Sequence, residues 1–197
     1  MESADDQIIE RMKRSRRGTL HGVDSFLDIS NAKTISKVLE RLTQIGELHR
    51  VAKGMYVRPV EDEAMGIVLP GIEEIAEAMA KRDKARAVPT GSFALYKLGL
   101  TSQMPMNIVY YTDSSSRQVK VGKQTITFKK ASTRNVSAIG EISKLVIQAL
   151  RTIGKNNVTE NEMRVIRERL AHEKPYQLQH DIKLAPEWIR QLMRPSL

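Results

Sequence analysis

The sequence contains no cysteine among its 197 residues, which excludes disulfide bonds, thiolate zinc sites and cysteine nucleophiles. Aromatic residues are scarce, at 5% of the chain with a single tryptophan. No run of residues approaches the roughly eighteen apolar residues of a membrane-spanning helix, and the charged N-terminus MESADDQIIERMKRS lacks the apolar segment of a secretory signal. We therefore expect a cytoplasmic protein with no membrane partner.

Familiar motifs for catalysis and metal binding are also missing. The four histidines occur at neither the H-x-x-x-H nor the H-E-x-x-H spacing of zinc sites. Gly122-Lys123 lacks the upstream glycine of a phosphate-binding P-loop, and residues 89–95 contain no G-x-S-x-G nucleophile elbow. We expect no catalytic residue, no metal and no cofactor. An enzyme that acts on nucleic acid stays open as an alternative.

Positive charge is in excess, with 32 Lys and Arg against 23 Asp and Glu and a net charge of +9. Residues 11–58 carry eleven basic and four acidic side chains, a net charge of +7, and residues 91–150 carry eight and two, a net charge of +6. Residues 61–90, between them, carry four and seven, a net charge of −3. Two basic patches favour an anionic partner, of which nucleic acid is the commonest. A basic soluble enzyme would have the same overall composition.

The first sixty residues predict three helices. A capping box at residues 3–6 begins a short amphipathic helix that runs into the basic stretch RMKRSRRG (11–18). A brief second helix is expected at residues 24–27, with Phe26 and Leu27 facing inward. The third helix lies within residues 30–46, where Ser30 or Asn31 can cap the start and Gly46 the end. One apolar stripe with a period of 3.6 residues follows its length: Ile35, Val38, Leu39, Leu42 and Ile45.

A basic hairpin, GELHRVAKGMYVRP (46–59), follows this helix and turns at residues 52–54. A hairpin this small is not stable alone in water, so we expect its apolar side chains to attach it to the helices. The order of three helices and a basic hairpin predicts a winged helix-turn-helix domain, in which the third helix enters the DNA major groove and the hairpin, or wing, reaches the backbone.

Cationic and amide side chains of this domain are candidates for contacts with phosphates and base edges. On the third helix they are Asn31, Lys33, Thr34, Lys37, Arg41 and Gln44. On the wing they are His49, Arg50, Lys53 and Arg58, and in the basic stretch that follows the first helix they are Arg14, Arg16 and Arg17. A winged helix that only docks proteins, with solvated lysines, is the alternative.

The remainder of the chain predicts a second, mixed domain. After an acidic junction at 61–71, the expected elements are a helix at 71–83, a strand at 85–88, a helix at 91–98, a strand at 107–112 and a hairpin at 118–131 that turns near Gly122-Lys123. One face of the resulting small antiparallel sheet is basic, with Lys120, Lys123, Lys129, Lys130 and Arg134. This face is a candidate surface for a protein partner, a second nucleic-acid surface or the solvated side of the sheet.

Helices are expected to complete the chain. One begins at Ser137, buries Ile139 and ends at Gly154; a second begins at the capping box of Thr159; the last begins at Pro186 and docks Trp188 in the core. The predicted fold class is therefore α+β. It comprises a winged helix-turn-helix domain at 1–60, a junction at 61–71 and an α+β domain with a helical tail at 72–197.

Three stretches carry a family resemblance: GMYVRP (54–59), AVPTGSFALYKLGLTSQMPMNIVYYTD (87–113) and ITFKKAS (126–132). Together they resemble the AbiEi-type antitoxins of type IV toxin–antitoxin systems, which act in abortive infection and phage defence. The resemblance implies a winged helix that binds repeats in its own promoter as a repressor, here through residues 31–44 and the wing around Lys53. It also implies a second domain that antagonises a toxin with a nucleotidyltransferase fold. A regulator without a toxin, whose second domain serves oligomerisation or ligand binding, is the alternative.

Overall fold

The computed structural model describes residues 3–196, which form two compact units. Of these residues, unit 1 comprises those up to 84 with the short segment 119–122, and unit 2 comprises 85–118 and those from 123 onward. Both units mix helices with small sheets, so the α+β class is confirmed. Within the described part of the chain, no helix is both long and apolar enough to cross a membrane.

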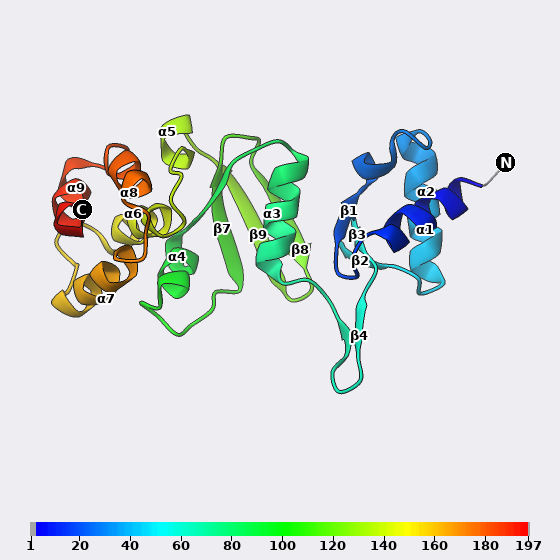
Figure 1. Cartoon of the computed structure of the whole chain (residues 1–197), viewed down its shortest axis with the longest axis horizontal. Helices are drawn as coiled ribbons and strands as arrows, with labels where there is room; N and C mark the ends of the chain where they lie inside the picture. Colours follow the sequence, from blue (N-terminus) through cyan, green and yellow to red (C-terminus); the bar gives the residue numbers. More distant parts are fainter. Residues whose placement is uncertain (1–2, 197) are drawn as a thin grey trace. The chain divides into compact units, whose positions relative to one another are not determined.

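Unit 1 begins with helices and small strands in alternation (Figure 1). Its elements are α1 (Ala4–Arg14), β1 (Leu20–Gly22), the 3-10 helix η1 (Val23–Phe26), α2 (Ala32–Gln44), β2 (His49–Ala52), β3 (Met55–Val57), β4 (Val60–Asp62), β5 (Gly66–Val68) and α3 (Ile72–Arg82). Strands β1, β3 and β2 form an antiparallel sheet with β3 in the middle. Strands β4 and β5 form a separate antiparallel pair.

The helices of unit 1 begin as their sequences predict. The Ser3 and Asp6 side chains form the expected capping box at α1, and the hydrogen bond from Ser3 lowers the pKa of Asp6. At α2, Asn31 Oδ1 accepts a hydrogen bond from the Thr34 backbone N–H at 3.0 Å. The apolar faces of α1, η1 and α2 then meet the small sheet in one buried cluster: Ile8, Met12, Phe26, Ile35, Val38, Leu39, Leu42, Leu48 and Tyr56.

Two residues of unit 1 were wrongly predicted to face inward. Leu27 is 54% exposed and Ile45 is 67% exposed. Both follow the last residue of a helical segment, since η1 ends at Phe26 and α2 ends at Gln44. The helical spacing therefore no longer determines the direction of either side chain.

The basic hairpin predicted at 46–59 is the β2–β3 pair. Ala52 lies opposite Met55, so a two-residue turn at Lys53-Gly54 joins the strands. Gly54 has a φ of +73°, which glycine adopts without the steric cost of a Cβ. The third strand, β1, was not predicted, because its three residues are too few to show an alternating pattern.

The stretch expected as a junction, residues 61–71, contains most of the β4–β5 hairpin and belongs to unit 1. Helix α3 also belongs to unit 1, where it contacts β1. Its buried residues include Ile72, Ile75 and Met79, as the sequence predicts.

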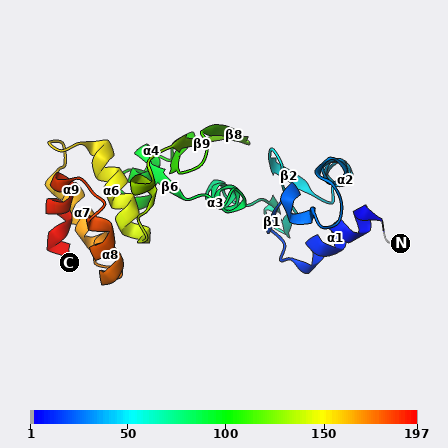
Figure 2. The same ribbon diagram turned by 90° about the horizontal axis from the view of Figure 1, so that it is seen from above.

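Unit 2 contains a sheet of four strands. A group of helices lies beside this sheet (Figures 1 and 2). Its elements are β6 (Ala87–Thr90), α4 (Gly91–Leu98), β7 (Asn107–Thr112), β8 (Arg117–Val121), β9 (Gln124–Lys130), α5 (Thr133–Val136), α6 (Glu141–Ile153), α7 (Glu160–Leu170), α8 (Pro175–Ile182), α9 (Glu187–Met193) and the 3-10 helix η2 (Arg194–Ser196). The first part of β8 lies in unit 2, and its residues 119–121 are grouped with unit 1.

The sheet has the strand order β6-β7-β9-β8. The expected turn at Gly122-Lys123 joins β8 to β9. The sheet was predicted to be antiparallel, and this is wrong for its central pair, because β7 runs parallel to β9 with Tyr110 opposite Phe128. Strand β6 is antiparallel to β7. The sheet is therefore mixed, because β8 occupies the edge and leaves β9 to pair with β7.

The C-terminal helices surround α6. Helix α6 contacts α4, β6, α7 and α8, and its buried side anchors a cluster of aliphatic residues from α4 to α9. Trp188 packs against this cluster, as expected, and is partly buried. The helix predicted from Ser137 begins instead at Glu141, and Ile139 is 46% exposed. Residues 133–136 form the separate short helix α5, so the chain changes direction before α6 begins.

Candidate functional site

The exposed side of α2 presents the side chains that sequence analysis assigned to DNA contacts. Lys33, Lys37, Arg41 and Gln44 are exposed, whereas Thr34 is half-buried. The four exposed side chains lie three to four residues apart along the sequence and so share one face of the helix. The opposite face of α2 is held in the core of unit 1. The helix is therefore fixed on one side and open to a partner on the other.

Two of these residues are already engaged within the protein. The Arg41 guanidinium forms an ion pair with Asp5 of α1. The side-chain oxygen of Asn31 accepts a hydrogen bond at the start of its own helix. Its side-chain NH₂ group is left for other contacts. Among the described residues, the ammonium groups of Lys33 and Lys37 donate no hydrogen bond and pair with no acidic side chain. The uncompensated positive charge of α2 therefore lies in its N-terminal half.

The β2–β3 hairpin adds two further free cations. Arg50 and Lys53 are exposed, and in the part of the chain that the structure describes neither side chain has a partner. Arg58, also assigned to this hairpin, is half-buried and donates a hydrogen bond to the Met12 carbonyl at 3.3 Å. It ties β3 to α1. His49 is half-buried, and its Nδ1 has no partner among the described residues.

In the basic stretch after α1, some arginines are likewise exposed and others have partners within the protein. Arg14 and Arg16 are exposed. Arg17 donates to the Pro59 carbonyl at 3.1 Å and pairs with Glu61 at 3.3 Å, so it fastens the start of β4. Arg11, which was not assigned to a contact, forms two hydrogen bonds of 2.6 Å with Asp28 and lowers the pKa of that carboxyl group. Sequence spacing alone did not separate these structural arginines from the free ones.

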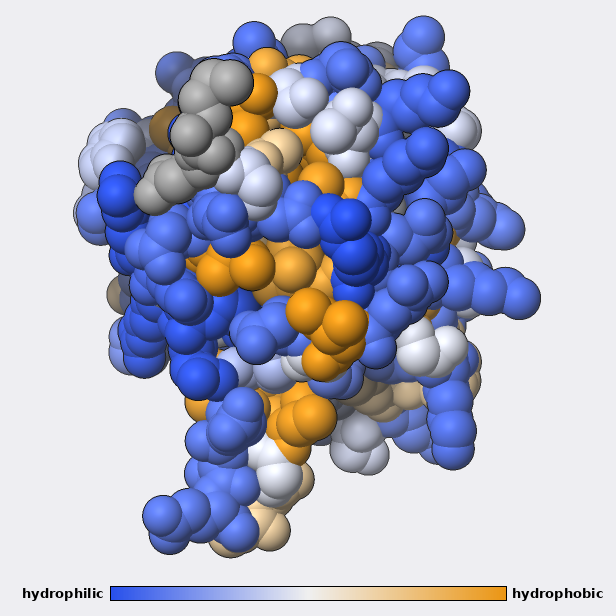
Figure 3. Space-filling view, turned by 90° about the vertical axis from the view of Figure 1, so that its right-hand side faces the viewer, coloured by the Kyte–Doolittle hydropathy of each residue, from blue (hydrophilic) through white to orange (hydrophobic). Residues whose placement is uncertain are grey.

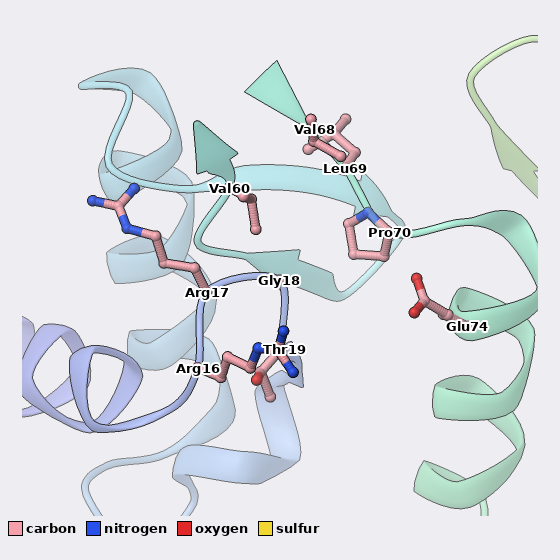
Figure 4. A pocket seen from close by; sticks show the side chains of 9 residues that line it. All are labelled: Arg16, Arg17, Gly18, Thr19, Val60, Val68, Leu69, Pro70 and Glu74. Atoms are coloured by element: carbon pink, nitrogen blue, oxygen red, sulfur yellow. The ribbon is translucent and has the colours of Figure 1, made fainter. Parts of the chain in front are cut away.

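A hollow of about 520 Å³ lies beside this stretch in unit 1, between the loop after α1, the β4–β5 hairpin and the start of α3. Figure 4 shows Val68, Leu69 and Pro70 on one side, Arg16 and Thr19 on another, and Arg17 extending away from the rest. Glu74 accepts a hydrogen bond from the Gly71 backbone at 2.8 Å and so caps α3. The polar groups of the hollow do not converge on one point.

The surface of unit 1 is mostly hydrophilic. Seen from the N-terminal side, hydrophilic residues surround an apolar strip that continues onto the hairpin projecting at the bottom (Figure 3). This projecting hairpin is the β4–β5 pair. Its exposed apolar side chains, together with the one just after it, are Val60, Met65, Ile67 and Leu69. No motif marked them, because isolated apolar residues beside acidic ones resemble an ordinary loop.

The second predicted surface does not form one face. Lys120, Lys123, Lys129 and Lys130 are all exposed, but Lys129 and Lys130 are consecutive in β9 and point to opposite faces of the sheet. Lys123 lies at the other end of β9, about 20 Å away at roughly 3.3 Å per residue. Arg134 lies in α5 rather than on the sheet and donates to the carbonyls of Lys183 and Leu184. It therefore fastens the end of α8.

The buried polar groups of unit 2 serve its architecture. Asp181 accepts hydrogen bonds from the backbone N–H groups of Ile139 and Gly140 at 2.9 and 2.8 Å and from the Ser143 hydroxyl. His180 Nδ1 lies 2.8 Å from the same carboxylate. The carboxylate thus lies between the histidine and the serine, which is not the order of a catalytic triad. No group of three His, Asp or Glu side chains in the described residues could hold a metal ion.

Comparison with known proteins places the chain in a family without an assigned function. Among solved structures, it is similar to the RV2827C protein from Mycobacterium tuberculosis, with a TM-score of 0.48 and 10% sequence identity over 98% of this chain and 82% of that one. No curated protein matches the chain. The model of the family of unknown function DUF6088 matches residues 7–178. The chain therefore belongs to the DUF6088 family.

Proposed function

We propose that residues 1–60 form a winged helix-turn-helix domain that binds double-stranded DNA, with α2 as the recognition helix and the β2–β3 hairpin as the wing. The order of α1, η1, α2 and the hairpin supports this proposal, as does the single apolar cluster that joins them. In this arrangement the lysines of α2 face the major groove, and Lys53 at the hairpin turn faces the adjacent backbone.

One observation carries the proposal: the N-terminal half of α2 presents two exposed lysines that have no acidic partner among residues 3–196. The start of the helix adds a partial positive charge of its own. Glu40 lies further along, and Arg41 is neutralised by Asp5. Insertion led by the N-terminal end of α2 therefore brings Lys33 and Lys37 to the DNA and keeps Glu40 away from phosphates.

The proposed biological role is a transcriptional autorepressor and antitoxin of a type IV toxin–antitoxin system, and not an enzyme. The likeness of residues 54–59, 87–113 and 126–132 to AbiEi-type antitoxins supports this role. Unit 2 would antagonise a toxin with a nucleotidyltransferase fold. A gene for such a toxin beside this one favours the antitoxin role, and its absence favours a regulator without a toxin.

DNA binding can be tested with the full chain and labelled DNA from upstream of its own gene. The double variant Lys33→Ala/Lys37→Ala should bind at least tenfold more weakly at low salt. Since each lost phosphate contact lowers the salt dependence by about 0.9 in log K against log salt, the slope should fall by up to roughly 2. Fluorescence anisotropy at several salt concentrations measures both quantities.

Lys155→Ala/Lys174→Ala is the matched control, because it removes the same charge from exposed lysines of unit 2. It should retain the affinity of the unchanged protein. Equal losses in the two double variants would mean that the total charge, rather than α2, attracts DNA. Failure of the unchanged protein to bind the upstream DNA at low salt would refute the proposal.

A further inference from the structure

Unit 2 contains a small hollow between α5 and α6 that no sequence motif marks. Its volume is about 10 Å³, which is the space of one water-sized atom. Ile147 and Leu184 supply apolar wall, and the polar lining comes from five side chains: Arg134, Asn135, Lys144, Gln148 and Arg151. We call this site the α5–α6 hollow.

Three of the five polar side chains are cations. Arg151 donates a hydrogen bond of 2.8 Å to Asn135 Oδ1, and Arg134 donates to backbone carbonyls. Among the described residues, neither guanidinium has a carboxylate partner. Lys144 pairs with Glu141 at 2.7 Å, and that carboxylate is 82% exposed. The hollow therefore holds more positive than negative charge.

The positive charge is also partly withdrawn from water. Burial lowers the pKa of Arg151, Tyr111 acts in the opposite direction, and the neighbouring charge of Arg134 lowers it further. Arg151 is half-buried and Arg134 is exposed, so water relieves part of the repulsion between their guanidinium groups, and an anion bound beside them would relieve more. The lining thus has the electrostatic character of an anion site.

Gln148 supplies an independent indication of a ligand. Its side chain is almost fully buried, with 2% of the residue exposed, and its Oε1 has no hydrogen-bond partner in the described residues. A half-turn about the last side-chain bond exchanges the carbonyl oxygen and the amino group. The same side chain can therefore offer N–H donors to an anion oxygen, and an unpaired buried amide gains most from such a partner.

We propose that the α5–α6 hollow binds the phosphate group of a small molecule, either inorganic phosphate or a phosphomonoester such as a nucleotide. One phosphate oxygen enters the hollow beside the amide of Gln148. The other oxygens are neutralised by the two guanidiniums and by Lys144. Phosphate fits better than a carboxylate, because it carries up to two negative charges and the lining contains three cations. This site is independent of DNA binding by unit 1.

Isothermal titration of the full chain with inorganic phosphate, AMP and acetate, at constant ionic strength set with chloride, tests the proposal. Inorganic phosphate, AMP or both should bind, and acetate should bind at least about tenfold more weakly. Arg151→Met should weaken phosphate binding by at least about tenfold, since a hydrogen bond to a charged group contributes roughly that factor or more. Gln148→Leu, which changes no charge, should weaken it several-fold.

Arg167→Met is the matched control, because Arg167 is exposed on α7 and its side chain forms no hydrogen bond or ion pair within the described residues. It should bind phosphate as the unchanged protein does. Equal binding of inorganic phosphate and AMP would identify phosphate itself as the ligand, and tighter binding of AMP would identify a nucleotide-like ligand. Both results support the site.

Three results would overturn the proposal: no binding of inorganic phosphate or AMP, binding of acetate as tight as that of phosphate, or unchanged binding in both Arg151→Met and Gln148→Leu. Circular dichroism of each variant establishes that it is folded. If Arg151→Met does not fold, Gln148→Leu alone decides, because it preserves the charge of the hollow.

Discussion

His21 is a polar residue held against the apolar cluster of unit 1. It is 9% exposed, its ring centroid lies 5.7 Å from that of Phe26, and it pairs with Tyr56 in the β1–β3 register. Burial lowers the pKa of the imidazole below its ordinary value of 6.5, because a charged ring would lose its hydration there. The neutral form is therefore the one that the folded state accommodates.

We expect this residue to make the stability of unit 1 depend on pH. Below about pH 6.5 the unfolded chain binds a proton that the folded chain does not, so stability is complete above this pH and decreases as the pH falls. Urea unfolding monitored by circular dichroism, at about pH 7.5 and about pH 5.5, measures the decrease. The variant His21→Phe should lose less stability than the unchanged protein over this interval.

The matched control for this prediction is His172→Phe, since His172 is exposed in unit 2. It should show the same pH dependence as the unchanged protein. If His21→Phe and the unchanged protein lose equal stability between the two pH values, burial of His21 is not the cause.

At the scale of elements, the start of α6 depends on side chains from distant parts of unit 2. Asp181 accepts hydrogen bonds from two backbone N–H groups before the helix, and Glu173 accepts from those of Ile142 and Ser143 at 2.7 and 2.8 Å. The first N–H groups of a helix have no partner within it. Glu173, in the loop after α7, supplies partners for two of them, and Asp181 of α8 holds the two residues just before the helix, so both segments are joined to the start of α6.

This arrangement leaves no room for a Cβ at Gly140, the N-cap of α6. A Cβ there would lie 2.3 Å from Ser143 Oγ and 2.5 Å from Glu173 Oε2. We expect Gly140→Ala to lower the free energy of unfolding of unit 2 by about 1–3 kcal/mol, the usual cost of overpacking. Fluorescence of Trp188, the single tryptophan, reports this unfolding because its side chain packs against the cluster of unit 2.

Gly71→Ala is the control, because Gly71 is the N-cap of α3 with a similar backbone, at φ −64° against −79° for Gly140. Its Cβ would approach only Glu74 Oε2, at 3.9 Å. Circular dichroism should show a change within about 0.5 kcal/mol for this variant. A similar loss in both variants would attribute the effect to glycine at an N-cap rather than to the crowding around Gly140.

Whether an element could be predicted from the sequence depends on how far apart along the chain the interacting groups lie. The caps of α1, α2 and α7 lie within three residues of the groups that they satisfy, so local spacing reveals them. Asp181 is 41 residues from Gly140, and no local pattern connects the two. Arg41 was assigned to DNA because Asp5 lies 36 residues away, and the parallel pairing of β7 with β9 was missed for the same reason.

At the scale of the whole molecule, two of the hydrophobic clusters that the described residues form are separate in sequence. One is built from residues between Ile8 and Tyr56, and the other from residues between Ala94 and Met193. The β4–β5 hairpin follows the first cluster directly. A two-stranded pair of this size contributes little stability of its own. Its turn exposes Glu63 and Met65, which makes it accessible to proteases.

We therefore expect glutamyl endopeptidase to cleave the folded protein first after Glu63, giving fragments 1–63 and 64–197. Each fragment contains one cluster in full, so the urea midpoint of Trp188 fluorescence in fragment 64–197 should equal that of the intact chain, within error. Mass spectrometry of early digestion products identifies the cut, and Glu63→Gln should delay it. A first cut elsewhere would show that the hairpin is protected. Loss of the Trp188 transition after cleavage would show that the cluster of unit 2 needs residues before Ala64, and the two clusters would then be one cooperative structure.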